Sequence, residues 1–191
     1  NSLSVPQVQV AVTDNDTAST SLAVNTGGAA VTTGGVSYLA DQYFTGGTTF
    51  SVTSAIGGTT DDVVYQTERY GSNFTYAVPV ANGAYSVTLK FSENWFNSAG
   101  QRVFDVNAEG GLVLDNLDIF AQAGGKFIAK DFVIPVTVND GVLNLQFTSS
   151  VDNAKIDAIQ IAPQSAPAAG LVVTQSGGST AVTEGGATDT L

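Results

Sequence analysis

The sequence predicts an all-β protein, an antiparallel β-sandwich of two sheets with long glycine-rich loops. Eight Gly-Gly pairs interrupt the 191 residues, and glycine permits the positive φ angles that tight turns require. Between these pairs lie short runs rich in Val, Thr, Phe and Tyr, in which apolar residues alternate with polar ones as they do in half-buried strands. We expect at most one helical turn, near residues 117–122, because no segment sustains a helical period.

Seven strands are expected, in chain order, at residues 63–70, 74–80, 84–91, 101–108, 132–138, 142–147 and 155–161. Two connections, Ala-Asn-Gly at 81–83 and Asn-Asp-Gly at 139–141, have the chemistry of hairpin turns. Short antiparallel strands in this number fit a two-sheet sandwich or a jelly roll. The aromatic side chains expected in its core are Tyr65, Phe74, Tyr76, Phe91, Phe104, Phe120 and Phe147.

The charge balance excludes two classes of partner. The chain has 17 acidic and 6 basic residues, a net charge of −11, which repels phosphate backbones and anionic lipid headgroups. No apolar run approaches the ~20 residues that span a bilayer. We therefore expect neither nucleic-acid binding nor membrane insertion.

The residue types that are absent restrict both chemistry and location. The sequence contains no Cys and no His, so disulfides, thiolate metal sites and most nucleophile–base pairs are unavailable. Carboxylate chemistry of the glycosidase kind remains, with Glu68, Glu93, Asp152 and Asp157 as candidates. Such side chains are usually solvated on loops or, when buried, paired with Arg69 or Arg102, so we do not expect enzymatic activity. The acidic, Thr- and Gly-rich composition favours an extracellular or cell-surface bacterial protein.

Composition divides the chain into three parts. Residues 21–162 are expected to form the main domain, with the end of a preceding repeat or a linker at 1–20. Residues 163–191 begin with a Pro/Ala/Ser-rich linker and continue into the first strand of a following repeat. We thus expect a segment of a longer chain. Both flanks resemble Calx-beta-like sandwiches repeated in large bacterial adhesins, which implies neighbouring β-sandwich repeats as partners.

A calcium site is predicted at the junction of these parts. Asp14 and Asp16 place oxygen ligands two residues apart on a turn, as Ca²⁺ prefers, and the adjacent Asp61 and Asp62 are a second candidate pair. The same residues are also ordinary turn formers. No cofactor is expected to be required, and Ca²⁺ is the one candidate.

Aromatic residues at strand ends suggest a sugar site. Trp95 and Phe96 follow the strand-like run 85–91, and neighbouring residues on a strand face opposite ways, so at least one ring is expected to be exposed. Exposed aromatic surface is usually kept for a partner, and the apolar faces of sugars stack on aromatic rings while carboxylates accept hydrogen bonds from hydroxyl groups. Tyr43, Tyr70 and Asp152 also lie where strands meet loops.

Several ordered motifs resemble malectin domains over roughly residues 22–161. They are YQTERY at 65–70, residues 74–79, LKFSENWF at 89–96, QRVFDV at 101–106, LDIF at 117–120 and NAKI at 153–156. The resemblance implies a malectin-like β-sandwich that binds a short, glucose-containing oligosaccharide without catalysis.

Carried over position by position, the resemblance assigns sugar binding to Tyr43, Tyr70, Trp95, Phe96 and Asp152. Trp95 stands where animal malectin has a tyrosine, so the diglucose preference of the animal protein need not hold.

Two alternatives remain open from the sequence. In the first, the domain is a structural spacer or interaction module in a calcium-stabilised stalk, and Trp95 and Phe96 contact a neighbouring module. In the second, it is a domain of a glycosidase, which requires two carboxyl groups at a fixed separation in a cleft.

Overall fold

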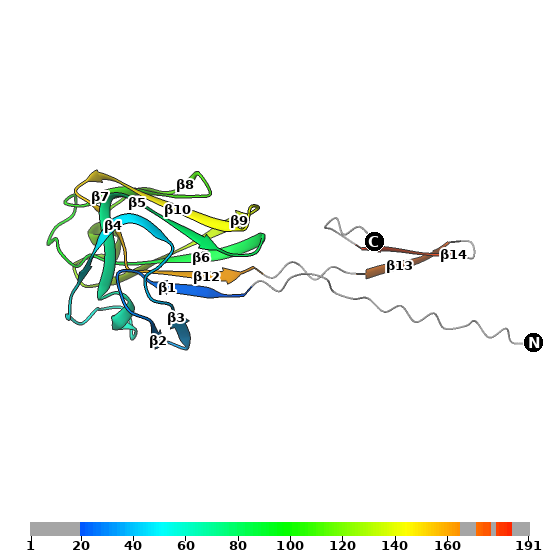
Figure 1. The fold of residues 1–191 in the computed structure, drawn as a ribbon, viewed down its shortest axis with the longest axis horizontal. Helices are drawn as coiled ribbons and strands as arrows, with labels where there is room; N and C mark the ends of the chain where they lie inside the picture. Colours follow the sequence, from blue (N-terminus) through cyan, green and yellow to red (C-terminus); the bar gives the residue numbers. More distant parts are fainter. Residues whose placement is uncertain (1–19, 165–170, 177–178, 185–191) are drawn as a thin grey trace, which may run out of the picture.

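The computed structural model describes residues 20–164, 171–176 and 179–184, and it confirms the all-β prediction (Figure 1). One sheet contains four antiparallel strands in the order β1 (Leu22–Asn25), β12 (Ala158–Pro163), β6 (Gly83–Ser92) and β9 (Ala129–Val138). The second sheet contains six strands: β11 (Ala154–Ile156), β5 (Thr67–Pro79), β10 (Val142–Val151), β7 (Val103–Ala108), β8 (Gly111–Leu117) and β4 (Phe44–Ser51), the last paired with β5.

Several smaller elements lie outside the two main sheets. The short strands β2 (Val31–Thr33) and β3 (Val36–Tyr38) pair with each other, and β13 (Leu171–Ser176) and β14 (Ser179–Glu184) form a separate hairpin. The expected helical turn is α1 (Ile119–Ala123), where the Asp118 side chain accepts a hydrogen bond from Ala121 N at 3.0 Å. Among the described residues, no helix is long and apolar enough to cross a bilayer.

The core lies between the two sheets and follows the period of two. Inward positions of β6 are fully buried, as are those of β10, while the residues between them face outward. Of the aromatic residues expected in the core, Phe120 is only partly buried and its neighbour Ile119 is buried instead. Tyr65 belongs to a smaller cluster with Tyr38, Ile56 and Val64.

Three strand predictions need correction. The expected strand 63–70 opens as a 3-10 turn, η1 (Asp62–Val64), and its remainder joins the next predicted strand to make β5. The expected strand 155–161 is divided at Asp157, whose backbone N–H donates to Lys90 O, and its halves belong to different sheets. Strands β1, β2, β3, β4 and β8 were not predicted, because they are short or rich in Gly, Thr and Asn.

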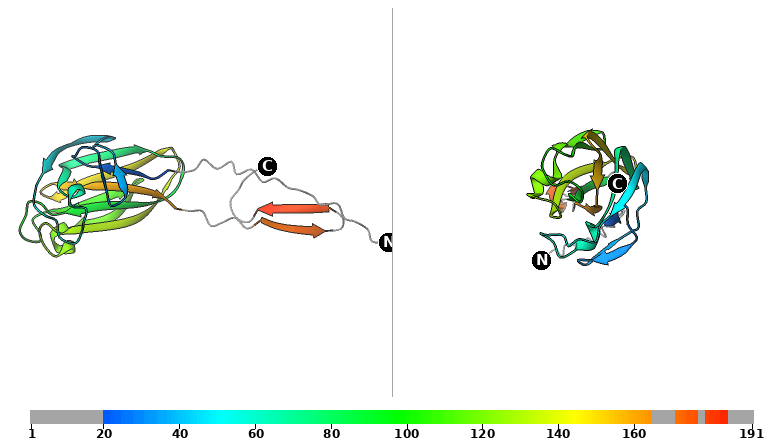
Figure 2. Two further views of the ribbon diagram at one scale, coloured as in Figure 1. Left: turned by 90° about the horizontal axis from the view of Figure 1, so that it is seen from below. Right: turned by 90° about the vertical axis from the view of Figure 1, so that its left-hand side faces the viewer.

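The pairing of the strands shows at which end of the sandwich the chain enters and leaves. Leu22 in β1 pairs with Ile161 in β12, and Pro163 pairs with Tyr85 near the start of β6. The chain therefore enters and leaves the sandwich at the end where β6 begins. The loop after β6 lies at the opposite end, as Figures 1 and 2 show.

Candidate binding site

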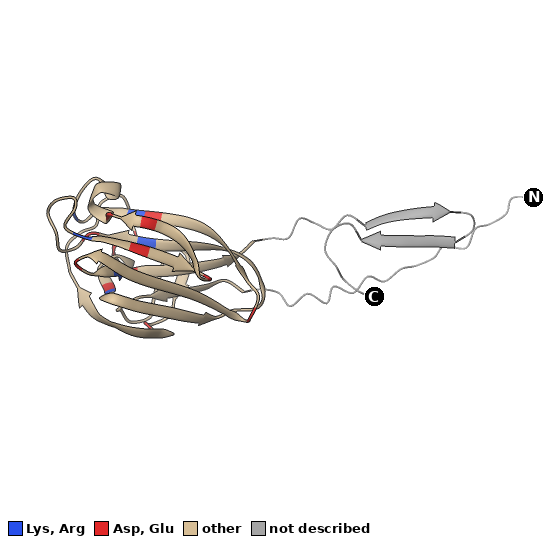
Figure 3. Cartoon of the chain, turned by 90° about the horizontal axis from the view of Figure 1, so that it is seen from above, with Lys and Arg blue, Asp and Glu red and all other residues tan. Residues whose placement is uncertain are grey.

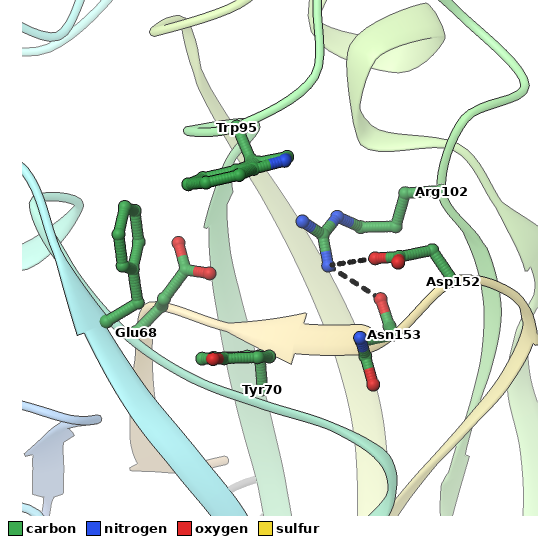
Figure 4. Close-up of a pocket in the computed structure, with 7 residues that line it drawn as sticks. Glu68, Tyr70, Trp95, Arg102, Asp152 and Asn153 are labelled. Atoms are coloured by element: carbon green, nitrogen blue, oxygen red, sulfur yellow. Dashed lines mark hydrogen bonds and ion pairs between the residues drawn. The ribbon is translucent and has the colours of Figure 1, made fainter.

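A pocket of about 250 Å³ opens at the end of the sandwich where β6 and β10 finish. Seven residues from five segments line it: Phe50 of β4, Glu68 and Tyr70 of β5, Trp95 of the loop after β6, Arg102 just before β7, and Asp152 and Asn153 between β10 and β11. Figure 4 shows the Trp95 and Tyr70 rings on opposite sides of the pocket. Arg102, Asp152 and Asn153 close a third side.

The loop that carries Trp95 is fixed by a buried carboxylate. Glu93 Oε1 accepts hydrogen bonds from the backbone N–H of Trp95 at 2.8 Å and of Phe96 at 3.0 Å. From the other side of the loop, Lys126 Nζ donates to Trp95 O at 2.9 Å. The indole itself remains 59% exposed and meets the Phe50 ring edge-on, with centroids 5.6 Å apart. The prediction that one of the two adjacent rings is exposed is confirmed.

Phe96 does not line this pocket. Its ring is half-buried, and the guanidinium carbon of Arg102 lies 5.2 Å from the ring centroid. Phe96 therefore makes a cation–π contact with Arg102, a residue that does line the pocket.

The register of β4 on β5 decides which aromatic side chain of this region reaches the pocket. Phe50 is paired directly with Glu68, and Thr48 with Tyr70. Tyr43, predicted for the site, instead accepts a hydrogen bond from Ala77 N at its carbonyl oxygen. Ala77 is seven residues beyond Tyr70 along β5, about 23 Å at ~3.3 Å per residue. The structure does not bring Tyr43 to the pocket.

The turn between β10 and β11 positions Asp152. Its φ of 57° lies in the left-handed region, which Asp tolerates better than most residues. Arg102 Nη1 holds this turn: it donates to Asn153 O at 2.7 Å and lies 3.6 Å from Asp152 Oδ2. The Asp152 side chain remains 37% exposed, so its carboxylate faces both the guanidinium and solvent.

Arg102 is itself held by Glu93. Its Nε donates to Glu93 Oε2 at 2.8 Å, and the two side chains are 5% and 1% exposed. Burial alone would raise the pKa of Glu93, but the hydrogen bond and positive charge of Arg102 outweigh it and hold that pKa below its usual range. This ion pair connects the Trp95 loop to the Asp152 turn.

A second buried charge cluster lies beneath the pocket. Lys155 Nζ is fully buried, 2.5 Å from Glu68 Oε2 and 2.9 Å from Asp157 Oδ1. Burial alone would lower the pKa of Lys155, yet the Asp157 and Glu68 carboxylates raise it. Burial raises the pKa of Asp157, and Glu68 adds to this effect. Figure 3 shows basic segments beside acidic ones on neighbouring strands.

The calcium predictions find no support in the described residues. Asp14 and Asp16 lie outside them. Asp61 Oδ1 accepts from Thr33 Oγ1 of β2 at 2.8 Å, and Asp62 Oδ2 accepts from Ile56 N of its own loop at 3.1 Å, so both carboxylates are engaged in holding this loop. Within 20–164 and the described hairpin, no three acidic side chains gather as a metal site would require.

Sequence reasoning did not assign Phe50 and Arg102 to the site, it noted Asn153 only as the neighbour of Asp152, and it assigned Glu68 only a possible catalytic role. One signal was present: Arg102 was expected to pair with an acidic residue, and the expected partners included Glu93. Phe50 carried no comparable signal, because its strand shows no alternation of apolar residues.

Comparison with known proteins identifies the family of this domain. The family model described as "Malectin domain" matches residues 20–159. Human malectin is 40% identical over 98 residues, which are 50% of this chain and 33% of that protein. Malectin-B of Xenopus laevis is 39% identical over 98 residues, 50% of this chain and 35% of that protein. The chain thus spans about a third of the length of these curated relatives.

Solved structures share the fold at lower identity. The ANXUR1 extracellular domain of Arabidopsis thaliana has a TM-score of 0.66 at 19% identity and covers 73% of this chain and 47% of that one. A β-glucuronidase of Bacteroides uniformis has a TM-score of 0.68 at 21% identity, over 76% of this chain and 18% of that one. The family match covers most of the chain, and the chain belongs to the malectin-domain family.

Proposed function

We propose that this chain is a non-catalytic carbohydrate-binding module whose ligand is a short, glucose-containing oligosaccharide. The observation that carries the proposal is the pocket between the exposed Trp95 ring and the Tyr70 ring, with the Asp152 carboxylate at its side (Figure 4). Aromatic faces stack on the C–H faces of a pyranose, and a carboxylate accepts hydrogen bonds from its hydroxyl groups.

The dimensions of the pocket suit a ligand of one or two sugar rings. Its volume of about 250 Å³ is below the ~300–1,000 Å³ of sites that enclose a drug-sized molecule. Trp95 is mostly exposed, so part of the ligand stays hydrated and the affinity should be modest. Phe50 widens the apolar wall beside Trp95.

Binding without hydrolysis is supported by how the carboxyl groups are engaged. A retaining or inverting glycosidase needs a carboxylic acid with a raised pKa facing the substrate. The pKa of Glu93 is lowered, after the hydrogen bond and charge of Arg102 outweigh its burial. Asp157 has a raised pKa but is fully buried beneath the pocket.

The position of the site supports a role in display. The chain enters and leaves the sandwich at the end remote from Trp95, so the pocket lies at the end opposite to these two connections. A spacer that extends a stalk in line would connect at its two opposite ends, so the arrangement favours the binding module over the structural spacer. The adhesin-like, extracellular bacterial setting, with adjacent repeats and Ca²⁺ at their junctions, is part of this proposal.

The test is a titration of the chain with maltose, isomaltose, cellobiose and laminaribiose, followed by Trp95 fluorescence and calorimetry. At least one disaccharide should bind and change the emission, and Trp95→Ala should abolish binding. Phe44→Ala is the matched control, because Phe44 is an exposed aromatic residue of β4 outside the pocket. If none of the four disaccharides binds, the proposed function is wrong.

A further inference from the structure

Two buried side chains present unpaired hydrogen-bonding atoms to the pocket. Glu68 is 3% exposed and Arg102 is 5% exposed, yet both line the cavity. Polar groups of buried side chains are almost always satisfied by protein or ordered water, so atoms of these two side chains that have no protein partner and open onto the pocket are available to a ligand.

For Glu68, all hydrogen bonds fall on one oxygen. Oε2 accepts from Lys155 Nζ at 2.5 Å and from Asn94 Nδ2 at 3.1 Å. Oε1 accepts from no donor in the part of the chain that the structure describes, and it is not enclosed by protein atoms.

For Arg102, two of its three nitrogens are engaged. Nε donates to Glu93 and Nη1 to Asn153 O, next to Asp152. Nη2 has no acceptor among residues 20–164, and in Figure 4 this second terminal nitrogen projects into the space between Trp95 and Tyr70. The Glu68 carboxylate projects into the same space from the opposite side.

We infer that Glu68 Oε1 and Arg102 Nη2 are ligand contacts that select neutral sugars with a pair of free hydroxyl groups. A hydroxyl both donates and accepts, so one hydroxyl can donate to Glu68 while a second accepts from Arg102. This inference rests on the proposed function and adds two specificity-determining residues to the aromatic platform.

The surrounding charges explain why a neutral sugar is preferred to a uronic acid. The positive charge of Arg102 is already shared by Glu93 at 2.8 Å and by Asp152 at 3.6 Å. A carboxylate on the ligand would meet this guanidinium together with the negative charges of Glu68 and Asp152. Like charges brought together in a partly dry site repel each other, so a uronic acid loses affinity.

Ligand analogues test the inference on the unaltered chain. The probes are the four disaccharides already named, each with its mono-deoxy derivatives and the matching uronic-acid disaccharide. Removing a hydroxyl that Glu68 or Arg102 engages should weaken binding about ten- to hundred-fold, because a buried polar group is then left unpaired. The uronic acid should bind at least about ten-fold more weakly than the neutral parent.

A variant then assigns the effect to Arg102. Arg102→Lys keeps a positive charge beside Glu93 but lacks Nη2, so the penalty for one deoxy derivative should fall to about two-fold or less. Arg69→Lys is the matched control: Arg69 is a buried arginine paired with Asp41 at 2.6 Å outside the pocket. For Arg69→Lys, the loss of affinity with each deoxy derivative should equal that of the unaltered chain.

The outcomes separate the two proposals. Binding of a disaccharide with deoxy penalties below about two-fold at every position overturns this inference and leaves the proposed function standing. The same holds if the uronic acid binds as well as its parent, or if Arg102→Lys retains every penalty. Failure of all four disaccharides to bind overturns both.

Discussion

The substitution Glu93→Gln removes the charge that connects the Trp95 loop to the Asp152 turn. The carboxylate accepts three hydrogen bonds, from Trp95 N, from Phe96 N and from Arg102 Nε. Glutamine retains one oxygen for the two backbone donors but directs an N–H group at the guanidinium. Breaking a buried pair in this way costs about 3–5 kcal/mol, because Arg102 is left without its counter-ion.

This loss in the free energy of unfolding should be measurable by urea denaturation at pH 7. For a domain of this size, ~3 kcal/mol corresponds to a fall in Tm of about 10 °C. Glu109→Gln is the control, since Glu109 accepts from Asn144 N at 2.7 Å without a charged partner and its variant keeps an acceptor. Its free energy of unfolding should change by less than about 0.5 kcal/mol.

The pH dependence of the stability lost in Glu93→Gln follows from the pKa of Glu93. That pKa is lowered in the folded state, where the hydrogen bond and charge of Arg102 outweigh burial. The stabilisation is therefore complete above the unfolded value of about 4.3 and is lost as the pH falls through the folded value. The difference in the free energy of unfolding between the unaltered chain and Glu93→Gln should therefore disappear below about pH 4. Equal unfolding of Glu93→Gln and Glu109→Gln at pH 7 would refute this reasoning.

Three further predictions concern the supports of the pocket. Gly27→Ala should destabilise far more than Gly35→Ala: both glycines have positive φ, but a Cβ at Gly27 would lie 2.1 Å from Glu68 O, whereas one at Gly35 meets nothing within 4 Å. The free energies of unfolding obtained from urea titrations should differ by more than ~2 kcal/mol, and equal free energies contradict the close approach. Lys155→Met should cost about 3–5 kcal/mol by leaving the Glu68 and Asp157 carboxyls without their cation; a stable variant by the same assay would refute the role of this cluster. Trp95→Ala should cost less than ~1 kcal/mol, because the ring is mostly exposed, and a Tm more than about 5 °C lower would show that Trp95 is structural.

The sequence predicted those parts of the site that depend on local chain geometry. Trp95 and Phe96 are adjacent aromatic residues just past a strand, so the prediction that at least one ring is exposed did not require the tertiary structure. The turn chemistry of Asp152 and Asn153 is equally local. Tyr70, Trp95 and Asp152 meet in one pocket.

The parts of the site that could not be predicted from the sequence depend on pairing between distant segments of the chain. Strand β4 pairs only with β5, and a bulge between Gly46 and Thr48 shifts its register. That shift places Phe50 opposite Glu68 and leaves Tyr43 near Ala77. A strand with the sequence FTGGTTFS has no apolar alternation that would reveal its register. The unpaired atoms of Glu68 and Arg102 likewise appear only when all their partners are placed.

The central claim is that a sugar binds between Trp95 and Tyr70. Trp95 is the single tryptophan of the chain, so a ¹⁵N-labelled sample has one indole N–H signal to follow by NMR. On addition of a glucose disaccharide, that signal and the Tyr70 ring signals should shift together, with the same dissociation constant as the calorimetric titration. A saturable titration in which these signals remain unchanged while those of another surface move would contradict the claim.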